Sequence, residues 1–276
     1  MSKVSSIRLL IRHTGAQNRI FWRTPIGAFF SLGLPVIMLV LFAALFGNDE
    51  ISTAYGEVTT AQFYTPALAV FAAASATYTN LGINLSIRRD EGILRRVRGT
   101  PLPPWVYLGG VVLSAVMIAL FATVMMIVLG VVAYGVNVEA DKLPAMIASF
   151  VVGATTFAIL GVALASVAKT ATAAPALANA TILPLAFVSN VFISFEGEAP
   201  DWLVLVGDIF PLRHYALSFG EAMSPNSAAP AFAWDRLAVM AAWALVGAVV
   251  AWRKFSWEPT VGASSTRGRR SRSRST

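Results

Sequence analysis

The 276-residue sequence contains no cysteine and only two histidines. Without cysteine the chain has no disulfide, no thiolate metal site and no cysteine nucleophile. The histidines, His13 and His214, lie too far apart along the chain to form a local metal motif, so no metal site is predicted. We expect His13 at the protein surface, near the edge of the polar side of an N-terminal helix.

The sequence also has few charges. Charged residues make up 13% and hydrophobic residues 57%, which is not the composition of a soluble globular protein. Six apolar stretches are each long enough to cross a hydrocarbon core of about 30 Å as a helix. These stretches lack the alternation of polar and apolar residues that is typical of the strands of a membrane β-barrel. The sequence therefore predicts an all-α membrane protein with six transmembrane helices, at 25–46, 61–83, 105–133, 144–168, 171–194 and 232–252.

These stretches contain no Asp, Glu, Lys or Arg apart from Asp235 and Arg236, at one end of the last stretch. Ion-coupled pumps usually carry buried ionisable groups, and voltage sensors carry arginines within a span. The sequence therefore argues against both classes. It also lacks any Gly-Lys pair, which a Walker A loop needs to bind ATP. We expect no cofactor bound by this chain, so an active transporter of this kind needs a separate motor chain.

The charges that are present segregate by sign between alternate linkers. If both termini are cytoplasmic, 18 of the 21 basic residues fall inside and 11 of the 14 acidic residues fall outside. This is the bias that orients membrane proteins during insertion. It predicts a multi-pass protein of the plasma (inner) membrane with cytoplasmic N- and C-termini.

Three segments outside the apolar stretches have their own character. Residues 1–24 predict an amphipathic interfacial helix, with Arg8, Arg12, Arg19 and Arg23 on one face, although an ordinary basic flank is the alternative. Residues 195–231 contain an apolar run too short to cross the membrane, which predicts an outer re-entrant helical segment before the last span. Residues 253–276 form a basic tail of alternating Ser and Arg, expected to be disordered and to contact anionic lipids rather than nucleic acid.

Residues 84–104 form the one substantial inner loop within the domain 25–252. Its charges are interleaved with Ile87, Ile93, Leu94 and Val97, which predicts a short amphipathic docking helix, and prolines then lead into the next span. A solvated charged loop is the alternative. Such a loop is where a cytoplasmic motor would dock.

This order of features resembles the permease subunit of type-2 ABC exporters, in the branch that exports drugs and lipids. Residues 88–102, Arg-Arg-Asp-Glu-Gly-Ile-Leu-Arg-Arg-Val-Arg-Gly-Thr-Pro-Leu, look like the coupling loop of that family, and residues 210–216, Phe-Pro-Leu-Arg-His-Tyr-Ala, look like its segment after the fifth span. The resemblance implies that two permeases, as a homodimer or with a related chain, work with a pair of cytoplasmic ABC ATPase subunits. ATP and Mg would be bound by that partner.

The resemblance also implies residue roles. The residues that would contact the ATPase are Asp90, Glu91, Leu94 and Arg95. The residues that would line the translocation path are Phe30, Tyr78, Asn80, Asn179 and Asn190, although hydrogen bonding between helices is the alternative for the polar ones. No catalytic residues are expected.

The substrate predicted from a path with few charges is a hydrophobic or amphiphilic drug or lipid moved outward. One alternative is a permease for polysaccharides or glycolipids. A second is a membrane-embedded enzyme or assembly factor that uses the outer re-entrant segment, where we single out Asp208, Pro211, Arg213, His214 and Tyr215 as residues that gate or pin the broken helices.

Overall fold

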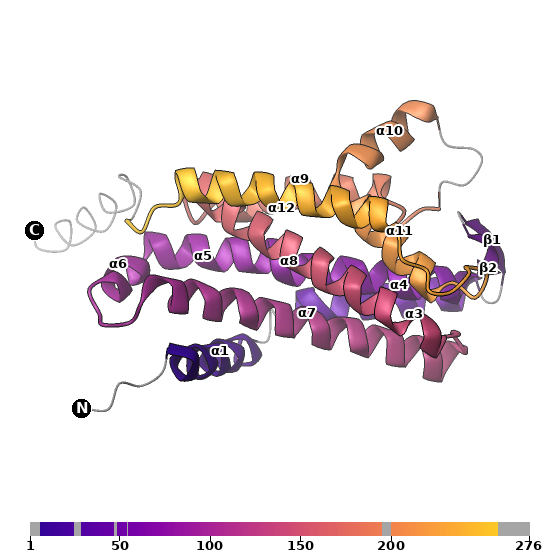
Figure 1. The fold of residues 1–276 in the computed structure, drawn as a ribbon, viewed down its shortest axis with the longest axis horizontal. Coiled ribbons are helices and arrows are strands. Elements are labelled where there is room, and N and C mark those ends of the chain that lie inside the picture. The colour runs from indigo at the N-terminus through magenta and orange to yellow at the C-terminus, as the bar shows by residue number, and fades with distance from the viewer. Residues whose placement is uncertain (1–5, 25–28, 47–48, 54, 195–199, 259–276) are drawn as a thin grey trace, which may run out of the picture.

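The computed structural model describes residues 6–24, 29–46, 49–53, 55–194 and 200–258 (Figure 1). The predicted basic tail and the start of the outer segment therefore lie largely outside the described residues. Most of the described chain is helical, as the long apolar stretches predict. The long helices run side by side along one axis (Figure 1).

In the described part of the chain, three helices are long and apolar enough to cross a membrane. They are α7 (Pro104–Tyr134), the unit of η3 (Ala140–Lys142) with α8 (Leu143–Val167), and α12 (Trp234–Lys254). Two shorter apolar helices are α3 (Leu34–Phe46), preceded by the π-helix η1 (Phe29–Gly33), and α9 (Ala173–Val188). These five correspond to five of the six predicted stretches.

The remaining stretch forms a helical run made of α4 (Thr60–Ala74), the π-helix η2 (Ser75–Asn80) and α5 (Leu81–Asp90). The residues at both junctions keep right-handed helical dihedral angles, so the run is continuous. The sequence predicts its end at Ile83, but the helix continues to Asp90. Leu85 and Ser86 are buried there, and Ser86 Oγ donates to the Gly82 carbonyl.

The core lies around α4 and α8. α4 packs against α3, α7 and α11 (Pro211–Met223), and nearly all of its residues are buried. α8 packs against α12, α5, η2 and α11. Close approach of η2 to α8 depends on Gly161, because an added Cβ there would lie 2.5 Å from the Thr77 carbonyl oxygen. Small residues at such contacts are typical of membrane helix packing.

The N-terminal helix α1 (Ser6–Trp22) lies against α7 (Figure 1). His13, expected at the surface, is half-buried against α7. Its ring packs 5.0 Å from that of Tyr107, and it occupies the space that a side chain at Gly110 would need. The helix α1 and the C-terminal end of α12 lie at the same end of the molecule (Figure 1).

At the opposite end the chain adds a small β-hairpin to the predicted all-helical fold. β1 (Glu50–Thr53) pairs antiparallel with β2 (Gly56–Thr59), with Glu50 opposite Thr59. Gly56, at φ 97°, takes a backbone conformation that glycine allows easily. The two short helices α10 (Asp201–Ile209) and α11 meet near this end, with Phe210 in an extended conformation between them.

Candidate functional site

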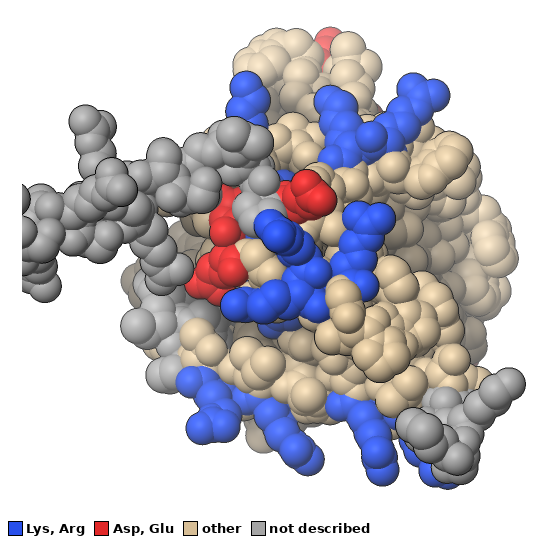
Figure 2. Space-filling view, turned by 90° about the vertical axis from the view of Figure 1, so that its left-hand side faces the viewer, with Lys and Arg blue, Asp and Glu red and all other residues tan. Residues whose placement is uncertain are grey.

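Lys and Arg side chains gather on one end of the helical bundle, which we call the basic end (Figure 2). The ends of α5, α8 and α12 and the beginning of α9 lie there, joined by the contacts described below. Exposed cations on these elements and on the loop after α5 are Arg95, Arg96, Arg98, Lys169, Arg253 and Lys254. The basic residues predicted to lie inside therefore gather at one end, with a few carboxylates among them (Figure 2).

The predicted docking segment is shorter than expected, because α5 takes up its first residues. Gly92, at φ 71°, turns the chain, and α6 (Ile93–Arg98) follows. Leu94 is fully buried and packs in a cluster with Leu81, Leu85 and Tyr107. The opposite side of this short helix is polar and exposed. Leu94 therefore anchors α6 to the bundle, while Glu91 and Arg95 face solvent.

Arg89 and Asp90 join this loop to the hairpin between α8 and α9. The buried Arg89 guanidinium donates to the carbonyl oxygens of Ala165 and Ala168, both at 2.6 Å, and lies 3.3 Å from Asp90 Oδ1. Asp90 Oδ2 in turn accepts from the Ala171 backbone N–H at 2.6 Å. The end of α8 and the turn before α9 thus gain partners for backbone groups that helix ends leave unpaired. We call this pair the clasp.

The four residues predicted to contact an ATPase are therefore separated by the structure. Glu91 and Arg95 are available on the surface of the basic end. Asp90 belongs to the clasp, with only 9% of its side chain exposed, and Leu94 belongs to the anchor of α6. Whether any of them contacts a partner stays a prediction.

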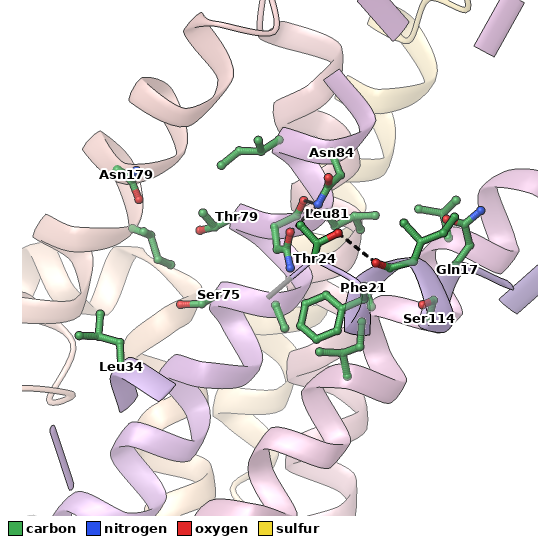
Figure 3. A pocket seen from close by; sticks show the side chains of 18 of the residues that line it. Gln17, Phe21, Thr24, Leu34, Ser75, Thr79, Leu81, Asn84, Ser114 and Asn179 are labelled. Carbon is green, nitrogen blue, oxygen red and sulfur yellow. Dashed lines mark hydrogen bonds between the residues drawn. The ribbon is translucent and has the colours of Figure 1, made fainter. Parts of the chain in front are cut away.

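A cavity of about 460 Å³ lies between α1, η2, α5, α7 and α9 (Figure 3). That volume is within the range of small-molecule sites, about 300–1,000 Å³. Its apolar walls include Phe21, Leu34, Phe71 and Ile118. The polar and charged residues that line it are Gln17, Thr24, Ser75, Thr79, Asn80, Asn84, Arg88, Ser114 and Asn179.

The π-helix η2 supplies several of these side chains. A π-helix has a wider turn than an α-helix, and such segments are frequent at functional sites. Ser75, Thr79 and Asn80 all line the cavity from this short segment, and Asn84 follows from α5. Asn84 Nδ2 donates to the Asn80 backbone carbonyl at 2.9 Å and contacts its side-chain oxygen, which fixes both amides at the wall.

The structure brings together only part of the predicted path. Asn80 and Asn179 line the same cavity from η2 and α9. Tyr78 does not line it, because its hydroxyl bonds Thr181 Oγ1 at 2.7 Å and so ties η2 to α9. Asn190 is buried beyond the end of α9 and lines a different, small cavity near the β-hairpin. The side chain of Phe30 lies outside the described residues.

The polar residues of the outer segment form two separate ion pairs. Arg213 Nε lies 2.9 Å from Asp208 Oδ1, and His214 Nε2 lies 2.7 Å from the Asp208 carbonyl, at the corner between α10 and α11. Pro211 begins α11, and Tyr215 is fully buried behind it. Glu221 instead pairs with Arg236 of α12 at 3.1 Å. In the described part of the chain, no three His, Asp or Glu side chains converge as a metal site.

A network at the end opposite the basic end was not predicted. Gln62 Nε2 donates to the carbonyls of Asn137 and Met223, and its Oε1 accepts from the Asn137 N–H. The buried Lys142 donates to the Ser224 carbonyl at 2.6 Å and pairs with Glu139 at 2.9 Å. These bonds fix the loop between α7 and α8 to the end of α11.

Sequence reasoning also missed most of the polar cavity wall, notably Gln17, Thr79, Asn84, Arg88 and Ser114. Arg88 was assigned only to the loop, and Gln17 only to the interfacial helix. A signal was present in the regular recurrence of small polar residues between Ser75 and Asn84, at a spacing of four to five residues. A spacing of four residues places side chains on one side of any helix, and the added steps of five fit the wider turn of a π-helix better.

Comparison with known proteins gives a family match over most of the chain. The model of a family described as ABC-2 type transporter matches residues 10–221, from α1 to α11. No curated protein matches the chain. The matched region contains the clasp, α6 and the whole cavity.

Proposed function

The chain belongs to the ABC-2 type transporter family, and on that premise we propose that it is the permease subunit of an ATP-driven exporter. In this proposal a separate cytoplasmic ATPase chain supplies the work. The working unit has two permease chains, identical or related, in the plasma membrane, with the basic end in the cytoplasm. The substrate moves outward.

The observation that carries the proposal is the connection from the exposed side of α6 to the two helices behind it. Glu91 and Arg95 are accessible at the basic end, and Leu94 holds α6 against α5 and α7. One residue before Glu91, the clasp binds the end of α8 and the turn before α9. A force applied at α6 therefore reaches α9, which forms one wall of the cavity.

The substrate class that we propose is hydrophobic or amphiphilic. The cavity combines apolar walls with amide and hydroxyl groups, and Arg88 is the only charged residue among the described residues that line it. A long glycan would favour extended aromatic surfaces. We expect amphiphiles to stimulate ATP hydrolysis by the reconstituted complex. Stimulation by a glycan alone would contradict this substrate class.

The docking proposal is tested by reversing the exposed charges of α6. The full chain is captured from its own membranes with its ATPase, and the complex is reconstituted in vesicles. The double variant Glu91→Arg with Arg95→Glu should lower ATP-driven transport about tenfold or more, because unpaired interface charges cost several kcal/mol. Arg253→Glu, an exposed reversal on α12, is the matched control.

The permease should keep its thermal stability in both variants, because the substituted side chains are exposed. Repeated capture of the chain without any nucleotide-binding subunit would contradict the proposal. Normal coupling in the double variant would remove α6 from the docking surface.

A further inference from the structure

The charge inside the cavity has one sign. Arg88 lines the cavity from the last turn of α5, and no carboxylate is among the described residues that line it. Arg88 is half-buried, and it forms none of the ion pairs found among the described residues. Its closest polar contact is a long one, 3.5 Å from Nη1 to the Tyr107 hydroxyl. A half-buried guanidinium without a carboxylate partner attracts an anion and repels a cation.

Two buried polar atoms of the wall have no hydrogen-bond partner. They are Gln17 Oε1 and Thr79 Oγ1. Gln17 is 9% exposed, and its Nε2 lies 3.2 Å from His13 Nε2, so its oxygen lies on the other side of the amide. Figure 3 shows Gln17 and Thr79 at the same cavity, on α1 and η2. Buried polar atoms are nearly always paired, so these two atoms are free to accept a hydrogen bond from a water or a ligand in the cavity.

Apolar side chains form another part of the wall. Phe71, Ile118 and Leu183 line the cavity, and Phe71 lies one turn before Ser75 in the helical run that ends near Arg88. Thirteen residues separate Ser75 from Arg88 along one helical run, which corresponds to roughly 20 Å at the helical rise. The cavity therefore has a cation at the end of this run that lies nearer the basic end, and apolar side chains together with hydroxyl and amide groups farther along it.

We propose that this cavity binds an amphiphile with an anionic headgroup. Arg88 pairs with the headgroup, and the alkyl chain of the amphiphile lies along Phe71 and Leu183. Gln17 and Thr79 bond polar atoms next to the headgroup. The proposal rests on the proposed function, because it names the substrate class of the exporter. Binding itself requires no ATPase and is measured on the permease alone.

The test uses the full chain in a neutral polyoxyethylene detergent, with binding measured by native mass spectrometry. Four probes separate charge from chain: dodecyl phosphate, dodecyltrimethylammonium, dodecyl glycerol ether and inorganic phosphate. Dodecyl phosphate should bind the native chain about tenfold more tightly than each of the others, a difference that one charge-assisted contact can supply.

Variants assign the contact to the cavity. Arg88→Gln should weaken the binding of dodecyl phosphate about tenfold, and Thr79→Val about threefold. Arg253→Gln, which removes an exposed cation outside the cavity, should leave binding unchanged. Arg88→Lys keeps the charge and should retain most of the affinity. If Arg88→Gln does not fold, the ranking of the four probes on the native chain decides the question.

Equal binding of the phosphate and ammonium amphiphiles would overturn the proposal, as would equal losses in Arg88→Gln and Arg253→Gln. Equal binding of inorganic phosphate and dodecyl phosphate would reduce the cavity to an anion site without an amphiphile. If the chain binds dodecyl phosphate selectively but captures no ATPase, the exporter proposal fails and the cavity proposal holds. If it captures an ATPase but shows no selectivity among the probes, the cavity proposal fails and the exporter proposal holds.

Discussion

At the scale of single residues, the clasp shows how one guanidinium holds two helices. Arg89→Ala removes two hydrogen bonds to carbonyls and leaves Asp90 without its cation. Breaking one partner of a buried pair costs about 3 kcal/mol or more, so we expect a clear fall in the Tm of the purified protein. Arg89→Lys should recover only part of the lost Tm, because an ammonium cannot donate in the planar fork geometry of a guanidinium.

Arg96→Ala is the control for the clasp, since this arginine is exposed on α6. Its effect on the free energy of unfolding should stay within about 0.5 kcal/mol. Equal Tm values for Arg89→Ala and Arg96→Ala would show that the clasp contributes nothing to the fold.

His13 gives the contact between α1 and α7 a pH dependence. Burial, and after it the charge of Arg88, lower the pKa of His13 below its usual value of 6.5. The unfolded chain therefore binds this proton more readily than the folded one. The stability linked to neutral His13 is present above about pH 6.5 and is lost as the pH falls through the lowered pKa.

The Tm of the native chain should therefore fall more between pH 7.5 and pH 5.5 than that of His13→Gln, which stays neutral. His214→Gln removes the only other histidine and should follow the native chain. The groups that face His13 are Arg88, Tyr107 and Gln17. Parallel curves for all three proteins would refute the assignment.

Single residues also show why the cavity could not be predicted in full. Asn80 and Asn179 were predicted from the family resemblance, and both line the cavity. Gln17 and Arg88 could not be predicted, since each belongs to a segment that is polar for other reasons. Their position at one wall depends on how α1 packs on α7, which a single sequence does not encode as a local pattern.

At the scale of elements, the long apolar stretches of the sequence predict where the helices lie. Where a helix ends depends on which buried and hydrogen-bonded contacts its last residues find. The run from Thr60 extends past Ile83 because Leu85 and Leu94 bury a common cluster and Arg89 finds carbonyl partners. The β-hairpin is held by single side chains, such as Tyr55, whose hydroxyl donates to the Leu217 carbonyl. Such long-range partners leave no periodic trace in the sequence.

Close packing of η2 on α8 gives a prediction at the same scale. Gly161→Ala places a Cβ 2.5 Å from the Thr77 carbonyl oxygen, which forces the two helices apart. Overpacking of this kind costs about 1–3 kcal/mol, so the yield of folded protein and the Tm should both fall.

Gly15→Ala provides the comparison, because a Cβ at Gly15 meets no atom within 4 Å. Alanine has the higher helix propensity, by about 1 kcal/mol, so α1 should be unchanged or slightly stabilised. If Gly161→Ala is as stable as Gly15→Ala, the helices do not depend on this close approach.

At the scale of the whole molecule, the chain has one basic end, an uncharged middle and a polar network at the far end. The basic end and the apolar middle follow from the sequence, because both are properties of composition along the chain. The clasp and the cavity follow only from the fold, because they join α5 to α8 and α1 to η2 across long stretches of sequence. In the proposed function, the basic end, which the sequence predicts, is therefore connected to the cavity through the clasp, which the sequence does not predict.

The central claim is that a separate ATPase drives this chain from the basic end. The absence of native cysteine allows single cysteines at Arg95 and Glu57, two exposed positions at opposite ends, without other changes. Each is coupled to a maleimide photo-crosslinker in native membranes. We predict that Arg95→Cys crosslinks to a nucleotide-binding chain and Glu57→Cys does not. Crosslinking to such a chain from Glu57→Cys alone, or labelling of Arg95→Cys from outside intact cells, would contradict the account.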